Sequence, residues 1–232
     1  MRPWSNYPIQ DCLEPLEPLP KQLFQIEPHP YVSLGAPYGF GMNPFCLRSG
    51  VVKRLLIAQN ELRHRSPDLR LAIFDAWRPM SVQAFMVNYT IDSLCNEREI
   101  RRNDPAQQSA LNQVLADVDR FWATPNNNPN NPPPHSTGAA IDLTLVTYDN
   151  NLINMGGAID TIGVVSEPDY FAEKLGQEAQ RWHQHRRLLA SVMAFAGFVQ
   201  HPGEWWHYSH GDQLWAWRSG TGTAIYGELA SN

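Results

Sequence analysis

The residues best suited to chemistry lie in residues 202–210, which read PGEWWHYSH. Glu204 stands three residues before His207, with Trp205 and Trp206 between them. An imidazole can donate a lone pair to a metal ion, and a carboxylate outside the ligand set can accept a proton from water. The segment therefore fits half of a metal site. It also fits a structural alternative, with Glu204 in an exposed turn and His207 as a core histidine.

A second segment, HSTGAAID, has the residue types for the other half of such a site. His135 and Asp142 are seven residues apart, so a continuous strand would put them on opposite faces. A turn at Gly138 removes that constraint. Together with His207 they would form the three-ligand set of a catalytic zinc, which keeps one position for water. Glu204 would then be the general base.

The segment FDAWRP contributes an arginine just after a predicted buried strand. The planar guanidinium of Arg78 suits a carboxylate or a developing oxyanion. A structural ion pair between Asp75 and Arg78 is the alternative interpretation.

Composition points to an ordinary globular protein. The chain has 232 residues, of which 43% are hydrophobic and 18% charged, and its net charge of −5 argues against a nucleic-acid partner. The three cysteines form no CxxC pair and no disulfide framework, which is typical of a reducing compartment. We find no apolar segment of a secretory signal and no run long enough for a membrane span. A cytoplasmic location is expected, with the periplasm left open.

Hydrophobic periodicity predicts helices and strands in a mixed order. Residues 1–30 are expected to form an extended N-terminal arm, residues 31–232 the domain, and residues 99–134 a variable Asn/Pro-rich insertion. Helices are predicted after a cap at Ser49, after a cap at Ser81 and over residues 178–198, and strands over residues 69–75 and 138–148. EWWHYSH and LWAWRSG are predicted to be two strands of a hairpin. The fold class is therefore α+β.

Taken in order, FDAWRP, HSTGAAIDLTL and EWWHYS resemble the D-alanyl-D-alanine dipeptidases. These are zinc D,D-dipeptidases of the vancomycin-resistance type, related to peptidoglycan D,D-carboxypeptidases. The resemblance runs from about residue 31 to 210. The family pattern is S-x-H-x-x-G-x-A-x-D followed by E-x-x-H, and it is matched here by His135, Gly138, Ala140, Asp142, Glu204 and His207.

This resemblance implies a single α+β domain whose central antiparallel sheet, flanked by helices, carries one zinc ion per chain. It implies zinc ligation by His135, Asp142 and His207. Glu204 would activate the zinc-bound water, and Arg78 would stabilise the oxyanion. The implied reaction is hydrolysis of the free dipeptide D-alanyl-D-alanine to two D-alanines.

The resemblance also suggests residues that bind substrate. Asp160 loosely matches a family aspartate that could hold the dipeptide ammonium, with a loop cap as the alternative, and Trp205 and Trp206 are expected around the substrate. Pro133 stands where the family has serine, so the exact dipeptide preference stays open. His201 and His210 are expected at the surface.

Other functions on the same scaffold stay open. They are a peptidoglycan D,D- or L,D-carboxypeptidase, an endopeptidase, and a non-catalytic zinc-binding module. The physiological role, the oligomeric state and the metal used in vivo are also left open.

Overall fold

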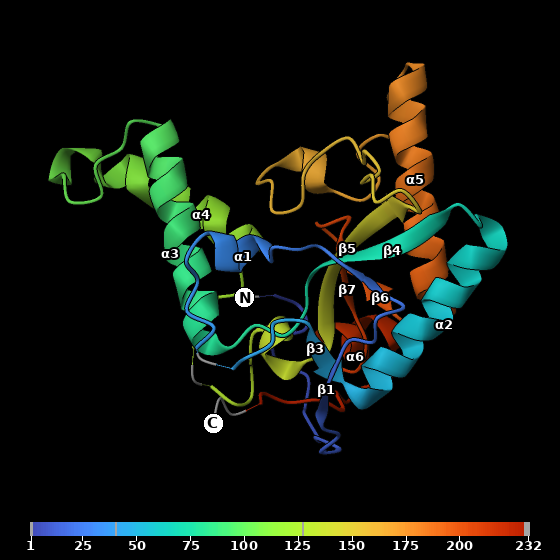
Figure 1. Ribbon diagram of the computed structural model, residues 1–232. Coiled ribbons are helices and arrows are strands. Elements are labelled where there is room, and N and C mark those ends of the chain that lie inside the picture. The colour runs from blue at the N-terminus through green and yellow to red at the C-terminus, as the bar shows by residue number, and fades with distance from the viewer. Residues whose placement is uncertain (1, 40, 127, 230–232) are drawn as a thin grey trace.

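A mixed five-stranded sheet organises the chain in the computed structural model, which describes residues 2–39, 41–126 and 128–229 (Figure 1). Only the first neighbouring pair in the sheet is parallel, so the predicted α+β domain with a mainly antiparallel central sheet is confirmed. The strands, in spatial order, are β2 (Phe24–Gln25), β4 (Leu69–Asp75), β5 (Ala140–Thr147), β7 (His207–Ser209) and β6 (Val199–Gln200).

Two long helices pack together beside the sheet, α2 (Ser49–Arg65) and α5 (Gln177–Phe195) (Figure 1). Their apolar residues recur at helical spacing and join the inward residues of the central strands in the main core. The buried apolar residues of α2 are Val51, Val52, Leu55, Ala58 and Leu62. This core gives β4 and β5 a rigid backing.

A second helical layer lies at the other side of the molecule, where α3 (Met80–Glu97) packs against α4 (Gln108–Phe121) (Figure 1). A second hydrophobic cluster joins these helices to the short helix α1 (Pro30–Ser33). The predicted serine caps are wrong. Ser49 is the first residue of α2, and Ser81 lies inside α3, where its hydroxyl donates to the carbonyl of Pro37.

The predicted C-terminal hairpin is also wrong, because LWAWRSG belongs to the helix α6 (Gln213–Ser219). The Asp212 carboxylate accepts a hydrogen bond from the Trp215 amide and caps the helix, and Gly220 follows it in the left-handed conformation at φ 72°. The N-cap at Asp212 and the glycine at the C-terminal end of the helix outweigh the strand preference of Trp215 and Trp217. The antiparallel partners of β7 are β5 and β6.

The segment before residue 31 is extended and tied to the domain at several points. It forms β1 (Leu16–Pro18), antiparallel to β3 (Cys46–Arg48), and it also contributes β2 to the main sheet. Nearer its start, Ile9 bridges to Ala224. Three short 3-10 turns complete the described structure: η1 (Pro105–Gln107), η2 (Pro134–Thr137) and η3 (Val164–Ser166). No helix in the described ranges has the length and apolar character needed to cross a membrane.

Candidate metal centre and active site

Strand register aligns three polar residues across the middle of the sheet. Asp142 on β5 is paired with His207 on β7 and, on the other side, with Asp75 on β4. The β4–β5 register shifts between Ile73 and Asp75, and this irregularity brings Asp75 opposite Asp142. Residues opposite one another in neighbouring strands project to the same face. The sheet therefore holds these side chains together without help from loops.

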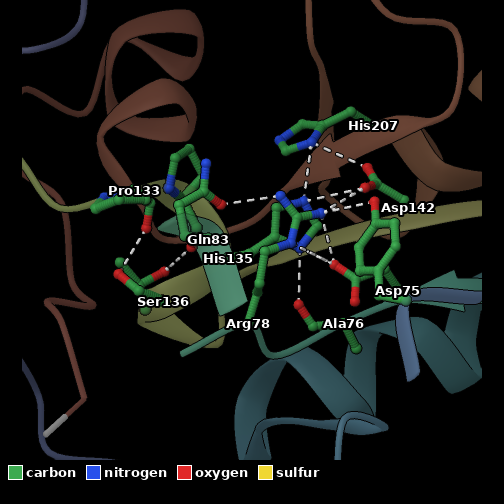
Figure 2. A network of polar contacts seen from close by, with 12 residues as sticks. Asp75, Ala76, Arg78, Gln83, Pro133, His135, Ser136, Asp142 and His207 are labelled. Atoms are coloured by element: carbon green, nitrogen blue, oxygen red, sulfur yellow. Dashed lines mark hydrogen bonds and ion pairs between the residues drawn. The ribbon is translucent and has the colours of Figure 1, made fainter. Parts of the chain in front are cut away.

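His135 reaches the same point from η2, just before β5 begins (Figure 2). Gly138 makes the turn between them at φ 69°, a conformation that favours glycine. A Cβ atom at Gly138 would also lie only 2.6 Å from Cδ2 of Leu16. The sequence therefore needs glycine here, as the predicted turn between His135 and Asp142 requires.

His135, Asp142 and His207 present their donor atoms to one another. His135 Nε2 lies 3.2 Å from His207 Nδ1 and 3.3 Å from Asp142 Oδ2, while His207 Nδ1 lies 3.1 Å from Asp142 Oδ1. Ligand atoms about 2.0–2.1 Å from a tetrahedral zinc lie about 3.3 Å apart. The spacing of the two nitrogens and the carboxylate oxygens therefore suits zinc.

In each histidine, the ring nitrogen that points away from the donor set has a polar partner of its own. Nδ1 of His135 lies 2.7 Å from the carbonyl oxygen of Ala76, and Nε2 of His207 lies 3.4 Å from Oγ of Ser209. Ser209 in turn donates to Asp212 at 2.7 Å. Such outer partners fix the tautomer and leave the inner nitrogens free to bind a metal. The residues present therefore fit a zinc ion.

Buried charge accompanies this donor set. Burial opposes ionisation of Asp142, but the charges and hydrogen bonds of His135 and His207 outweigh it and lower its pKa below the ordinary value. Burial likewise opposes ionisation of Asp75, and the Arg78 guanidinium then lowers its pKa. Both carboxylates are therefore negative and ready to balance a cation.

Glu204 lies beside the donor set but outside it. Its carboxylate oxygens are 3.7 Å from Nδ1 of His207 and 3.6 Å from Nδ1 of His201, farther than the contacts of Asp142. The side chain is buried, which rules out the exposed-turn alternative. Burial, reinforced by the charge of Asp142, raises the pKa of Glu204 to about 8. A carboxylate with this affinity for protons is suited to general-base chemistry.

Arg78 forms the structural ion pair of FDAWRP and also lines a cavity at the donor set. Its guanidinium lies 2.7 Å from Asp75 and 3.3 Å from Asp142 (Figure 2). A further donor of the guanidinium bonds the side-chain oxygen of Gln83 at 3.0 Å. The oxyanion role of Arg78 stays a prediction.

Asp160 lies at the end of the cavity near Arg78. The Tyr31 hydroxyl donates to Asp160 at 2.8 Å and accepts from Arg78 at 3.2 Å. Burial, reinforced by the charge of Asp142, raises the pKa of Asp160 to about 7. A buried carboxylate with few hydrogen-bond donors is a good partner for a cation from outside.

The space enclosed by these groups is small, a cavity of about 40 Å³. Trp206 lines it, and its predicted role in substrate binding stays a prediction. Trp205 instead packs its ring 5.2 Å from the Arg186 guanidinium and lines a different, more apolar hollow. The two indoles still meet edge to face, with ring centroids 5.5 Å apart. The structure brings together the following predicted residues: Arg78, His135, Asp142, Asp160, Glu204, Trp206 and His207.

Several residues of the cavity were missed in the sequence. His201 was expected at the surface, as was His210, but both are buried, and burial lowers the pKa of His201 well below its usual value. Trp122 and Arg2 also line the cavity. No local motif marks Arg2, because it lies 202 positions before Glu204 and meets it only in the folded chain.

Comparison of the sequence with known proteins identifies a family. The D-ala-D-ala dipeptidase family, Peptidase_M15, matches residues 25–221. The chain belongs to this dipeptidase family. It is therefore a member of a peptidase family, and the enzyme class expected from the three motifs is confirmed. The family match includes both motifs that supply the metal-donor residues.

Individual relatives carry the same family name. A D-alanyl-D-alanine dipeptidase of Synechocystis sp. is 42% identical over 230 residues, covering 94% of this chain and 90% of the relative. A D-alanyl-D-alanine dipeptidase of Escherichia coli is 31% identical over 140 residues, covering 60% of this chain and 54% of the relative. Among solved structures, VanYB in complex with D-alanine-D-alanine has a TM-score of 0.46 and 13% identity, with coverage of 94% and 93%.

Proposed function

We propose that this family member binds one zinc ion per chain and hydrolyses free D-alanyl-D-alanine to two D-alanines. The observation that carries the proposal is one small cavity lined by the donor set, a buried glutamate outside that set, and an arginine. The two sequence relatives described above bear the name of this dipeptidase.

His135, Asp142 and His207 would hold the metal, which supplies Lewis acidity that polarises a carbonyl and makes water a better nucleophile. Glu204 accepts a proton from the attacking water, consistent with its raised pKa. It then delivers that proton to the leaving amine. The Arg78 guanidinium donates hydrogen bonds to the oxygen that becomes negative.

The preference for a free dipeptide is supported by Asp160 and Tyr31. A dipeptide carries an ammonium group close to its single peptide bond, whereas a longer peptide has an uncharged amide there. The buried Asp160 carboxylate gains a cationic partner only in the first case.

The proposal is tested by D-alanine release from zinc-loaded protein. The substrates are D-Ala-D-Ala, its N-acetylated form and L-Ala-L-Ala, with metal-free protein as the control. We expect the free D,D-dipeptide to exceed the acetylated one by on the order of 100-fold or more in kcat/KM, because acetylation leaves Asp160 unpaired. Faster cleavage of the acetylated peptide would contradict this and favour a carboxypeptidase or endopeptidase. Stoichiometric zinc without any cleavage would favour a non-catalytic module.

A further inference from the structure

The catalytic cavity adjoins a larger one of about 270 Å³, and Arg2 lines both. The two cavities also share Ala123 and Pro134 as walls. Pro133, which precedes Pro134 in the chain, lines the larger cavity. Neither proline has a backbone N–H, so this stretch of wall donates no hydrogen bond to an anion. Arg2 is the cationic group at this boundary in the described part of the chain.

The arm around Arg2 is fixed by packing and hydrogen bonds. The buried Trp4 indole lies edge-on to His201 at 5.4 Å between ring centroids and packs on Trp217 at 5.2 Å. The Gln213 side-chain amide donates to the backbone carbonyl of Tyr7 at 2.6 Å. These contacts hold the start of the arm against the same histidine that touches Glu204. The position of Arg2 is therefore set by the fold.

The Arg2 guanidinium makes a backbone hydrogen bond but no ion pair among the described residues. It donates a hydrogen bond of 3.4 Å to the backbone carbonyl of Asp119, and it has no ion pair with a carboxylate within the described residues. Burial lowers its pKa, and the charges of Glu204 and Asp119 act in the opposite direction. A partly desolvated guanidinium without a paired anion is a strong site for a carboxylate ligand.

The order of groups along the cavity fits the two charges of a dipeptide. Asp160 stands on the Arg78 side, where it would receive the ammonium. Glu204 protonates the leaving amine, which belongs to the C-terminal residue, so the free carboxylate lies next to Glu204. Arg2, which comes from the arm, lines the same cavity as Glu204.

We propose that Arg2 binds the C-terminal carboxylate of the substrate and so determines specificity for an unblocked C-terminus. The inference rests on the proposed dipeptidase function. It assigns anion binding to the N-terminal arm, since Pro133 and Pro134 have no backbone N–H to donate.

The test compares Arg2→Ala and Arg2→Lys with the exposed control Arg63→Ala, on D-Ala-D-Ala and on its C-terminal amide. For the free dipeptide we expect Arg2→Ala to raise KM by about 10- to 100-fold with little change in kcat. Arg2→Lys should recover part of the loss, since it keeps the charge. On the amide, which has no carboxylate, Arg2→Ala and wild type should differ by less than about threefold. Equal losses on both substrates, or no loss on either, would overturn the assignment.

A binding measurement separates this inference from the proposed reaction. Calorimetry gives the Kd of D-Ala-D-Ala in the zinc-loaded Glu204→Gln protein, with and without Arg2→Ala. Weaker binding in the double variant, alongside a wild type that does not hydrolyse the dipeptide, would sink the proposed reaction and keep the role of Arg2. Hydrolysis by wild type with an unchanged Kd in the double variant would sink the role of Arg2 alone.

Discussion

The residues of the cavity fall into two groups that are built in different ways. In the metal-donor set, Asp142 and His207 face each other across paired strands, and His135 enters one turn before the same strand. The two flanking charges come from elsewhere: Arg2 comes from the arm, and Asp160 comes from an irregular segment, where it adopts φ 65°. The metal-donor set is thus fixed by sheet register, while the flanking charges depend on contacts between distant segments.

This difference matches the demands of the two tasks. Metal ligands must meet a narrow distance requirement, which hydrogen-bonded strands backed by a packed core can satisfy. Substrate selection requires charges at set positions, and extended segments can vary these without disturbing the sheet. We therefore expect changes around the metal-donor set to affect zinc binding or the stability of the fold there, and changes to the flanking charges to affect KM.

A large effect on zinc binding is expected from Ser209→Ala, next to the metal-donor set. The hydroxyl of Ser209 links His207 to Asp212, so its loss should free the imidazole to rotate and weaken zinc binding by about 10- to 100-fold. Competition with a chromophoric chelator measures this affinity, and the exposed Ser219→Ala serves as the control. Unchanged zinc affinity would mean that the strands alone orient His207.

Gly138→Ala is expected to affect the stability of the fold, because the turn at Gly138 lies against Leu16 of the arm. The added methyl group would meet Leu16 in a left-handed backbone, so we expect a loss of about 1–3 kcal/mol in the free energy of unfolding. Gly35→Ala is a matched control, because Gly35 has φ 88° but open space around its Cβ position. Urea unfolding measures both. Equal losses would assign the whole effect to backbone strain and none to packing against the arm.

A pH-dependent effect on stability is expected for Asp160→Asn, which removes one of the flanking charges, in metal-free protein. The pKa of Asp160 is raised to about 7 in the fold, so the folded state holds its proton more tightly than the unfolded chain. The stability from this proton is fully present below about pH 4 and is lost as the pH rises through 7. The variant, which needs no proton, should gain in Tm relative to wild type at pH 8 and not at pH 4. An equal difference at both pH values would contradict the assignment.

The same contrast explains what could be predicted from the sequence. The proposed ligands and Glu204 lie in short motifs of fixed spacing. Strand β4 was predicted with its observed bounds, because hydrophobic periodicity is a local signal. The register shift before Asp75 and the arrival of Arg2 depend on pairing between distant segments, which leaves no local signal. The helix α6 was missed because its aromatic residues favour a strand, while its cap at Asp212 decides the outcome.

Of the two buried carboxylates, Glu204 is proposed as the general base and Asp142 as a metal ligand. This assignment is tested by measuring zinc content and D-alanine release in Glu204→Gln and Asp142→Asn side by side. We expect Glu204→Gln to keep stoichiometric zinc and to lose about 10²- to 10⁴-fold in kcat, the usual contribution of a general base. Asp142→Asn should lose stoichiometric zinc, because it removes the charged ligand. Loss of zinc in Glu204→Gln with zinc retained in Asp142→Asn would reverse the two assignments and contradict the account.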